Sequence, residues 1–263
     1  MDMELPIELI FMILQYLSYN DLYNISKTNR FFRNFVKSFE WNLEIKIARA
    51  RIRDIMSIIR SPFIQFYGTD IDSINQIINN NKCKKVVIRY TKITKKIEAN
   101  LEKLILWKTS VDNLSIFSNC CRVELNETKI NCNSVQTLES VKFLTIKYSC
   151  NNEIFSYLKF PNLIKVVLAD CVTDNRLRMF LANNPTIETL VLICNNISNN
   201  SIRFLTELAP NLKNLIIHED IDNNSIEYLN CLTNLKYLDI SDTKITNIKA
   251  IDLDHTTLKF KIN

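Results

Sequence analysis

The chain has 263 residues, of which 47% are hydrophobic, enough to bury a substantial core in one or two domains. Its net charge of +5 comes from 33 basic and 28 acidic residues spread along the chain, which is not the footprint of a nucleic-acid-binding protein. A single glycine, Gly68, excludes the glycine-rich loops that hold phosphates and dinucleotides.

Neither export nor membrane insertion is indicated by the sequence. Acidic residues and Pro6 stand where a signal peptide would carry lysines and an apolar run, and polar residues interrupt every hydrophobic stretch. We therefore expect a soluble intracellular protein that contacts no membrane, with its cysteines reduced.

Eight cysteines and two histidines offer little for metal binding or catalysis. No Cys-x-x-Cys pair occurs, and His218 and His255 are widely separated in the chain. The adjacent Cys120 and Cys121 have no neighbouring histidine in sequence to act as a base. The sequence therefore predicts no metal, no cofactor and no catalytic residue.

The first forty residues predict three short helices. Pro6 suits the start of the first helix because its φ is fixed, and apolar residues continue to Leu17 on almost every side. Ser18 and Asp21 form a capping pattern for a second helix, and a phenylalanine-rich third helix precedes Trp41. Three short helices cannot bury this apolar surface among themselves, so a partner or the following domain must cover it.

The same residues resemble an F-box. Its order and spacing are matched by Leu5-Pro6-x-Glu8-Leu9, Ile13-Leu14-x-Tyr16-Leu17-Ser18, Asp21-Leu22, Ser26, Asn29-Arg30-x-Phe32 and Trp41. Asn29 departs from the family, in which many members place cysteine before the arginine. The resemblance implies binding to the Skp-type adaptor of a cullin–RING ubiquitin ligase. The matching positions are adaptor-facing or belong to the core of the module, and the sequence does not separate these roles: Leu5, Pro6, Leu9, Ile13, Leu14, Leu17 and Leu22.

The remainder of the chain repeats the pattern Leu-x-x-Leu-x-Leu-x-x-(Asn or Cys). The clearest copies are Leu163-x-x-Val166-x-Leu168-x-x-Cys171 and Ile187-x-x-Leu190-x-Leu192-x-x-Asn195. Further copies have their first strand position at 86, 104, 123, 144, 215 and 238, with fragments at 64 and 258. These are leucine-rich repeats, in which the x-Leu-x-Leu-x core is a short strand. Residues 175–181 and 201–208 are expected to be return helices, shorter repeats to have only a turn or 3₁₀ segment, and asparagine to take left-handed turn positions.

The predicted fold class is α/β. A three-helix F-box-like module (1–45) and a helical connector (46–62) precede a curved leucine-rich-repeat solenoid (63–263), whose parallel sheet lines the concave face. We expect this face to bind a protein target through an exposed apolar band, although β-branched residues also suit parallel strands without any ligand. The predicted band consists of Trp107, Val167, Val191, Ile193, Ile216 and Tyr237.

Together the two parts resemble the F-box/leucine-rich-repeat family over nearly the whole chain. The resemblance implies a non-enzymatic substrate-recognition subunit of a Skp–cullin–F-box ubiquitin ligase, which holds an unknown protein target near the ubiquitin donor. The alternative is a leucine-rich-repeat interaction scaffold outside any ligase, whose N-terminal helices only cap the solenoid. The Asn, Ile and Lys usage resembles proteins of protists or the large DNA viruses that infect them. The protein would then act in the cytoplasm or nucleus, of the host cell if it is viral.

Overall fold

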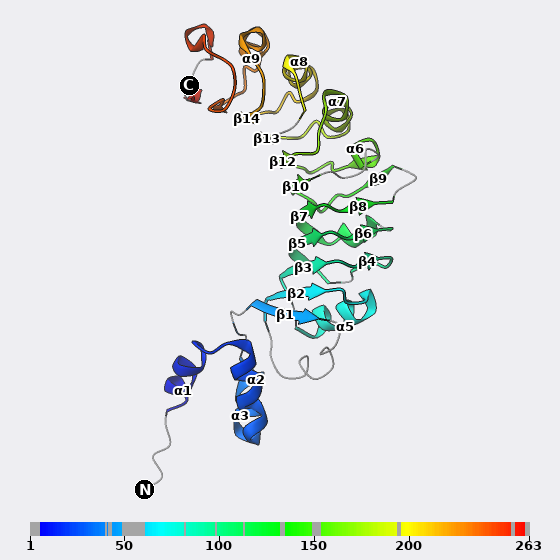
Figure 1. The fold of residues 1–263 in the computed structure, drawn as a ribbon, viewed down its shortest axis with the longest axis vertical. Helices are drawn as coiled ribbons and strands as arrows, with labels where there is room; N and C mark the ends of the chain where they lie inside the picture. Colours follow the sequence, from blue (N-terminus) through cyan, green and yellow to red (C-terminus); the bar gives the residue numbers. More distant parts are fainter. Residues whose placement is uncertain are drawn as a thin grey trace.

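A computed structural model describes residues 6–39, 41, 44–48, 61–81, 83–97, 99–112, 114–131, 135–148, 154–193, 196–253 and 256–260. A group of helices lies at the N-terminal end, and a curved solenoid occupies the rest of the chain (Figure 1). Leu5, Asn195, His255 and most of the expected connector lie outside the described residues.

Three N-terminal helices are present, as the sequence predicts: α1 (Ile7–Leu14), α2 (Tyr19–Thr28) and α3 (Arg30–Ser38). Pro6 is the N-cap residue of α1, one position before its expected place inside the helix. The Ser18–Asp21 capping box is confirmed, since the Asp21 carboxylate accepts from the Ser18 N–H at 3.2 Å and the Ser18 hydroxyl oxygen accepts from the Asp21 N–H. Asn29 ends α2 and caps α3, because its Oδ1 accepts from the Phe32 N–H at 2.9 Å.

The solenoid is built on one parallel sheet. Within the described residues this sheet has eleven strands, in the order β1 (Glu44–Ala48), β2 (Phe63–Tyr67), β3 (Lys85–Arg89), β5 (Leu101–Trp107), β7 (Cys120–Asn126), β10 (Phe143–Lys147), β12 (Lys165–Ala169), β13 (Thr189–Ile193), β14 (Asn214–His218), β15 (Tyr237–Asp239) and β16 (Thr257–Lys259). The repeat frame is in register, so Leu144 pairs with Val123 on one side and Val166 on the other. The predicted strand positions from 64 to 258 are confirmed.

The sheet begins earlier than the sequence predicts. β1 pairs in parallel with β2, and Ile45 lies opposite Ile64, both buried. Residues 46–48 are therefore strand and not part of a helical connector, because buried Ile45 and its pairing to β2 extend the repeat core by one unit. Residues 49–60 lie outside the described part of the chain.

The return segments cover the outer side of the sheet (Figure 1). The predicted return helices are confirmed as α7 (Asp174–Asn183) and α8 (Asn199–Leu208). The other helical returns are α5 (Ile71–Asn81), η1 (Leu114–Phe117), α6 (Ile154–Tyr157), η2 (Asn223–Ser225), α9 (Ile226–Asn230) and η3 (Ile248–Ala250). Repeat length sets the type of return: Leu104 follows its partner Val86 by 18 residues, whereas Leu215 follows Leu190 by 25.

Several short repeats form small outer sheets, where the sequence predicted only turns or 3₁₀ segments. One consists of β4 (Lys92–Ile93), β6 (Ser110–Val111) and β8 (Lys129–Ile130), and the other of β9 (Gln136–Thr137) and β11 (Leu158–Lys159). Such two-residue strands have no periodicity that a sequence could reveal. They leave Lys129 and Lys159 exposed on the side opposite the main sheet.

The turn after each of six strands has a left-handed residue, with φ between 47° and 58°. Asparagine was expected at such positions, but the residues are Gly68, Tyr90, Lys108, Glu127, Tyr148 and Asp170. The backbone imposes the conformation: each N–H donates to the carbonyl that ends the next strand, as from Gly68 to Arg89 at 2.9 Å. In the five of these turns whose following residue is described, that residue is small and buried, and it is most often threonine: Thr69, Thr91, Thr109, Thr128 and Cys171.

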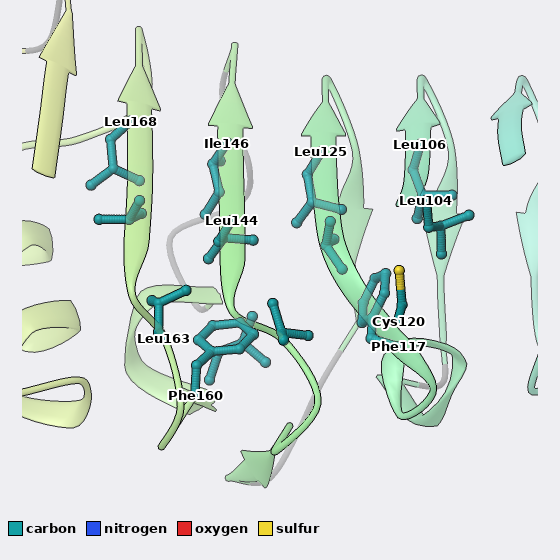
Figure 2. Close-up of a cluster of buried hydrophobic side chains, with 14 of the residues drawn as sticks. Leu104, Leu106, Phe117, Cys120, Leu125, Leu144, Ile146, Phe160, Leu163 and Leu168 are labelled. Carbon is teal, nitrogen blue, oxygen red and sulfur yellow. The ribbon is translucent and has the colours of Figure 1, made fainter. Parts of the chain in front are cut away.

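The core lies between the sheet and the outer returns. Leucine and isoleucine side chains from successive strands form stacked rows, and Phe117 and Phe160 fill the space below them (Figure 2). Cys120 lies beside these rows (Figure 2), and both Cys120 and Cys171 are buried. Their packing agrees with the prediction that cysteines serve here as small core residues.

Candidate protein-binding surfaces

Helix α1 presents an apolar face to solvent. Leu9, Met12 and Ile13 of α1 and Tyr16, two residues after its end, follow i, i+3, i+4, i+7 spacing and are all exposed, Ile13 by 57% and Tyr16 by 84%. We call these four residues the α1 face. Apolar side chains grouped in this way are a mark of an interaction surface, since isolated exposed residues need no such explanation.

The opposite side of α1 packs inside the module. The Phe11 ring lies 4.7 Å from that of Phe39 and 5.5 Å from that of Trp41, measured between centroids. The Trp41 indole N–H donates to the Val36 carbonyl at 2.8 Å, which fixes the chain just before β1. Because the inner side of α1 is occupied, the α1 face remains available to another protein.

The structure separates the seven predicted adaptor-binding residues. Pro6, Leu9 and Ile13 are exposed and Leu17 is half-buried, whereas Leu5 lies outside the described residues. Leu14 is 5% exposed and Leu22 is 0% exposed, so these two build the module core and have no surface for an adaptor.

Sequence reasoning missed four exposed apolar side chains of the module: Ile7, Met12, Tyr16 and Phe31. The helical spacing counted from Leu9 would have found Met12 and Tyr16. The spacing counted from Ile10 instead favoured Leu14 and Leu17. In an almost wholly apolar helix, more than one set of residues has the spacing of an apolar face.

The predicted apolar band on the concave sheet is only partly continuous. Val167, Val191 and Ile216 are direct cross-strand neighbours, and Ile193 lies further along the strand of Val191. Val191 is 7% exposed, so its prediction as an exposed side chain is wrong: its neighbours on β12 and β14 cover it. Tyr237 lies one strand beyond β14, beside Asn214.

Trp107 does not join this band. It lies on β5, and β7 and β10 separate it from β12. Its ring packs with Arg89, whose guanidinium carbon lies 4.5 Å from the centroid of Trp107 and 5.6 Å from that of Tyr67. Trp107 therefore belongs to a stack across β2, β3 and β5.

Basic side chains gather on the concave side of strands β3 to β12. We call this set the basic face, and it comprises Lys85, Arg89, Lys103, Arg122, Lys147 and Lys165. Aromatic rings hold three of them. Besides Arg89 on Trp107, Lys85 Nζ lies 4.1 Å from the Phe63 centroid and the Arg122 guanidinium lies 4.3 Å from that of Phe143. The cations are thereby kept over the sheet.

Glu124 is the one acidic residue at the outward positions of the described strands β2 to β12. Burial tends to raise the pKa of its carboxyl group, but hydrogen bonds from Asn126 and Lys103 and the charges of Lys103 and Lys147 outweigh this and lower it. The two lysine ammonium groups lie 3.1 and 3.7 Å from the carboxylate. Glu124 thus stays charged, and the six basic side chains still give the basic face a net positive charge.

The candidate nucleophile suggested by the cysteine pair is not supported. Burial raises the pKa of the Cys120 thiol to about 11, so the group is protonated at neutral pH. Among the described residues, no cluster of three or more His, Cys, Asp or Glu side chains is placed to hold a metal ion. Nor does any helix in that part of the chain have the length and apolar character needed to span a bilayer.

The N-terminal segment matches a known family model, and the fold resembles a solved structure. Residues 3–43 match the family model of the F-box domain, and no curated protein sequence matches the chain. The crystal structure of a TLR13–ssRNA13 complex is similar with a TM-score of 0.57 and 17% identity, covering 87% of this chain and 41% of that one. An internalin (inlF) from Listeria monocytogenes has a TM-score of 0.35 and 14% identity, covering 93% of this chain and 94% of that one.

The fold is a leucine-rich-repeat solenoid, as predicted, and the segment that matches the F-box domain model lies at its N-terminal end. The chain spans less than half of the TLR13 chain, 41%, and at this identity the likeness concerns the fold alone.

Proposed function

We propose that this chain is the substrate-recognition subunit of a Skp–cullin–F-box ubiquitin ligase. Its F-box domain would bind a Skp-type adaptor, and its repeats would bind a protein target. The α1 face carries the proposal, because it is an exposed apolar stripe inside the segment that matches the F-box model. The chain itself would perform no bond chemistry and would act by holding the target near the ubiquitin donor, in the cytoplasm or nucleus.

The energetics of the α1 face suit a protein partner. Further burial of each half-exposed apolar side chain contributes roughly 1 kcal/mol, so the four residues together offset part of the cost of association. An aspartate in the middle of the α1 face would have to be desolvated on binding, so its burial would oppose association where an apolar side chain favours it.

The alternative function, a scaffold whose helices merely cap the solenoid, is less favoured. A cap would turn its apolar side chains toward the first strand, whereas Leu9, Met12 and Ile13 are exposed to solvent. The rings of Phe39 and Trp41 pack edge to face at 6.2 Å, and Trp41 stands three residues before β1. We therefore place the domain boundary near residue 43, with β1 in the solenoid and not in the proposed 46–62 connector.

Co-purification with a Skp-type adaptor tests the proposal. We expect the full chain to retain the adaptor and the double variant Leu9→Asp with Ile13→Asp to lose it. A matched control introduces the same two negative charges on exposed positions of α2 and α3, Asn24→Asp with Asn34→Asp, and should bind like the original chain. Equal thermal unfolding of all three proteins would exclude misfolding as the cause. Failure of the unaltered chain to retain any adaptor would leave the scaffold function.

A further inference from the structure

We infer that the target segment recognised by the repeats is an extended, acidic stretch of polypeptide that lies across the basic face. This inference rests on the proposed function in one respect, namely that the concave surface receives the target. It adds the chemistry of the ligand, which the F-box match says nothing about.

Charge complementarity is the first argument. Six basic side chains project from the concave side of β3, β5, β7, β10 and β12, against the single acidic Glu124. Lys103 and Lys147 both contact that carboxylate, so it neutralises only part of the positive charge. The acids elsewhere on the concave side lie beyond this region, as Asp239 does on β15, paired with Lys259 at 2.8 Å. A ligand lying over β3 to β12 therefore meets a positive potential.

The cations are held in place before any ligand arrives. Lys85 lies on the Phe63 ring, Arg122 on the Phe143 ring, and Arg89 between Tyr67 and Trp107. Ring contacts of this kind restrict the long basic side chains, so less conformational entropy is lost when a carboxylate binds them. The arrangement is a preformed set of donors and not a collection of freely moving surface charges.

The spacing of the strands fits an extended chain. One row of the register runs from Lys85 through Lys103, Arg122 and Phe143 to Lys165. Neighbouring strands are about 4.8 Å apart, so this row covers about 19 Å, the length of about six extended residues. An extended peptide across the row would present a side chain to the face at about every 7 Å, close enough for alternate acids to find a basic partner.

A single-stranded nucleic acid is the competing ligand for a basic surface with aromatic residues, and two features disfavour it. Base stacking needs open ring faces, but cations already lie over Phe63, Phe143 and Trp107. Glu124 also lies in the centre of the region, where it would repel a phosphate chain. A peptide can place an apolar or neutral residue over that point.

Fluorescence anisotropy on the full chain tests the inference with three labelled probes. These are an alternating Glu-Thr peptide of about twelve residues, the corresponding Lys-Thr peptide, and an oligouridylate of about ten nucleotides. We expect the acidic peptide to bind best, and its affinity to fall as NaCl rises from about 50 to about 300 mM.

Two charge-reversal variants locate the binding. Arg122→Glu with Lys165→Glu should weaken acidic-peptide binding by about tenfold or more. Lys129→Glu with Lys159→Glu makes the same charge change on the outer side and should weaken it far less. Four results would each overturn the inference. The acidic and basic peptides could bind equally well, the oligouridylate could bind more tightly than the acidic peptide, the acidic peptide could fail to bind, or both variants could lose binding to the same extent.

Adaptor retention is measured separately on the same proteins. The variant Arg122→Glu with Lys165→Glu should still retain the adaptor, and Leu9→Asp with Ile13→Asp should still bind the acidic peptide. Loss of adaptor binding by the unaltered chain would count against the ligase role while leaving the acidic ligand standing. If the unaltered chain retained the adaptor but did not bind the acidic peptide, the inference about the ligand would fail and the ligase role would stand.

Discussion

The side-chain oxygen of Asn184 accepts a hydrogen bond from the backbone N–H of Phe160 at 2.6 Å, which joins the end of α7 to the preceding repeat. The amide nitrogen of the same side chain donates to the Phe180 carbonyl at 2.8 Å and to the Leu158 carbonyl at 3.4 Å. Asn184 is completely buried. One amide therefore satisfies polar backbone groups that water cannot reach.

Replacement of Asn184 should destabilise the solenoid. Asn184→Leu has a similar size but leaves the Phe160 N–H without its acceptor, and we expect a loss of about 2–4 kcal/mol in the free energy of unfolding. Urea denaturation followed by circular dichroism measures the change. Asn200→Ala, at an exposed position of α8, is the control and should change stability by less than about 0.5 kcal/mol. A similar effect in both variants would contradict the assigned role.

Asp239 should make the C-terminal repeats sensitive to acid. Burial opposes ionisation of its carboxyl group, but the hydrogen bond from Lys259 and those from Ser241 lower its pKa from 3.8 to about 2. A carboxyl group with a lower pKa in the folded state stabilises the fold above its unfolded value, and this contribution is lost as the pH falls through about 2. The contribution at neutral pH is on the order of 2 kcal/mol.

Unfolding between pH 5 and pH 2 gives the corresponding measurement. The chain should lose stability over this range, and Asp239→Asn should be less stable at neutral pH but lose less on acidification. Asp252→Asn, at an exposed position, should keep the original pH profile. An unchanged acid dependence in Asp239→Asn would mean that other carboxyl groups, such as Asp174, account for it.

Core and surface roles within the N-terminal helical module can be separated by two single substitutions. Leu22 is fully buried, so Leu22→Ala should cost about 2–5 kcal/mol and unfold the helical module. Ile13 is mostly exposed, so Ile13→Ala should leave unfolding almost unchanged while weakening adaptor binding. Thermal unfolding and adaptor titration of both proteins provide the comparison. Strong destabilisation by Ile13→Ala would place that side chain in the core instead.

The repeat strands were predictable because their signal is long-range and redundant. Pairs such as Leu190 and Leu192 recur in one frame from β2 to β16, and each copy supports the next. β1 was missed because it is the first strand of the sheet, so that no copy before it supports the frame, and because its pair Ile45 and Ile47 follows a helical stretch. The two-residue outer strands were missed because they have no periodicity that a sequence could reveal.

Site details depended on packing that periodicity does not encode. The sequence left open whether Leu14 faces the adaptor or the module core, and it left out Met12. Both lie in one apolar helix, and only the contact between Phe11 and Trp41 decides which side is the inner one. Val191 faces the concave side as expected but is covered by its cross-strand neighbours. Threonine took the ladder position after the left-handed residue, where asparagine or cysteine was expected, because a small hydroxyl such as that of Thr128 can donate to the carbonyl of Leu106.

Hydrogen–deuterium exchange of the full chain, alone and with a Skp-type adaptor, tests the central claim most directly. The account assigns the adaptor to the α1 face and the target to the concave sheet. It predicts that the adaptor slows exchange in residues 6–17 while the strands β3 to β12 exchange as before. Protection of the strands, or no protection of the helices at saturating adaptor, would contradict it.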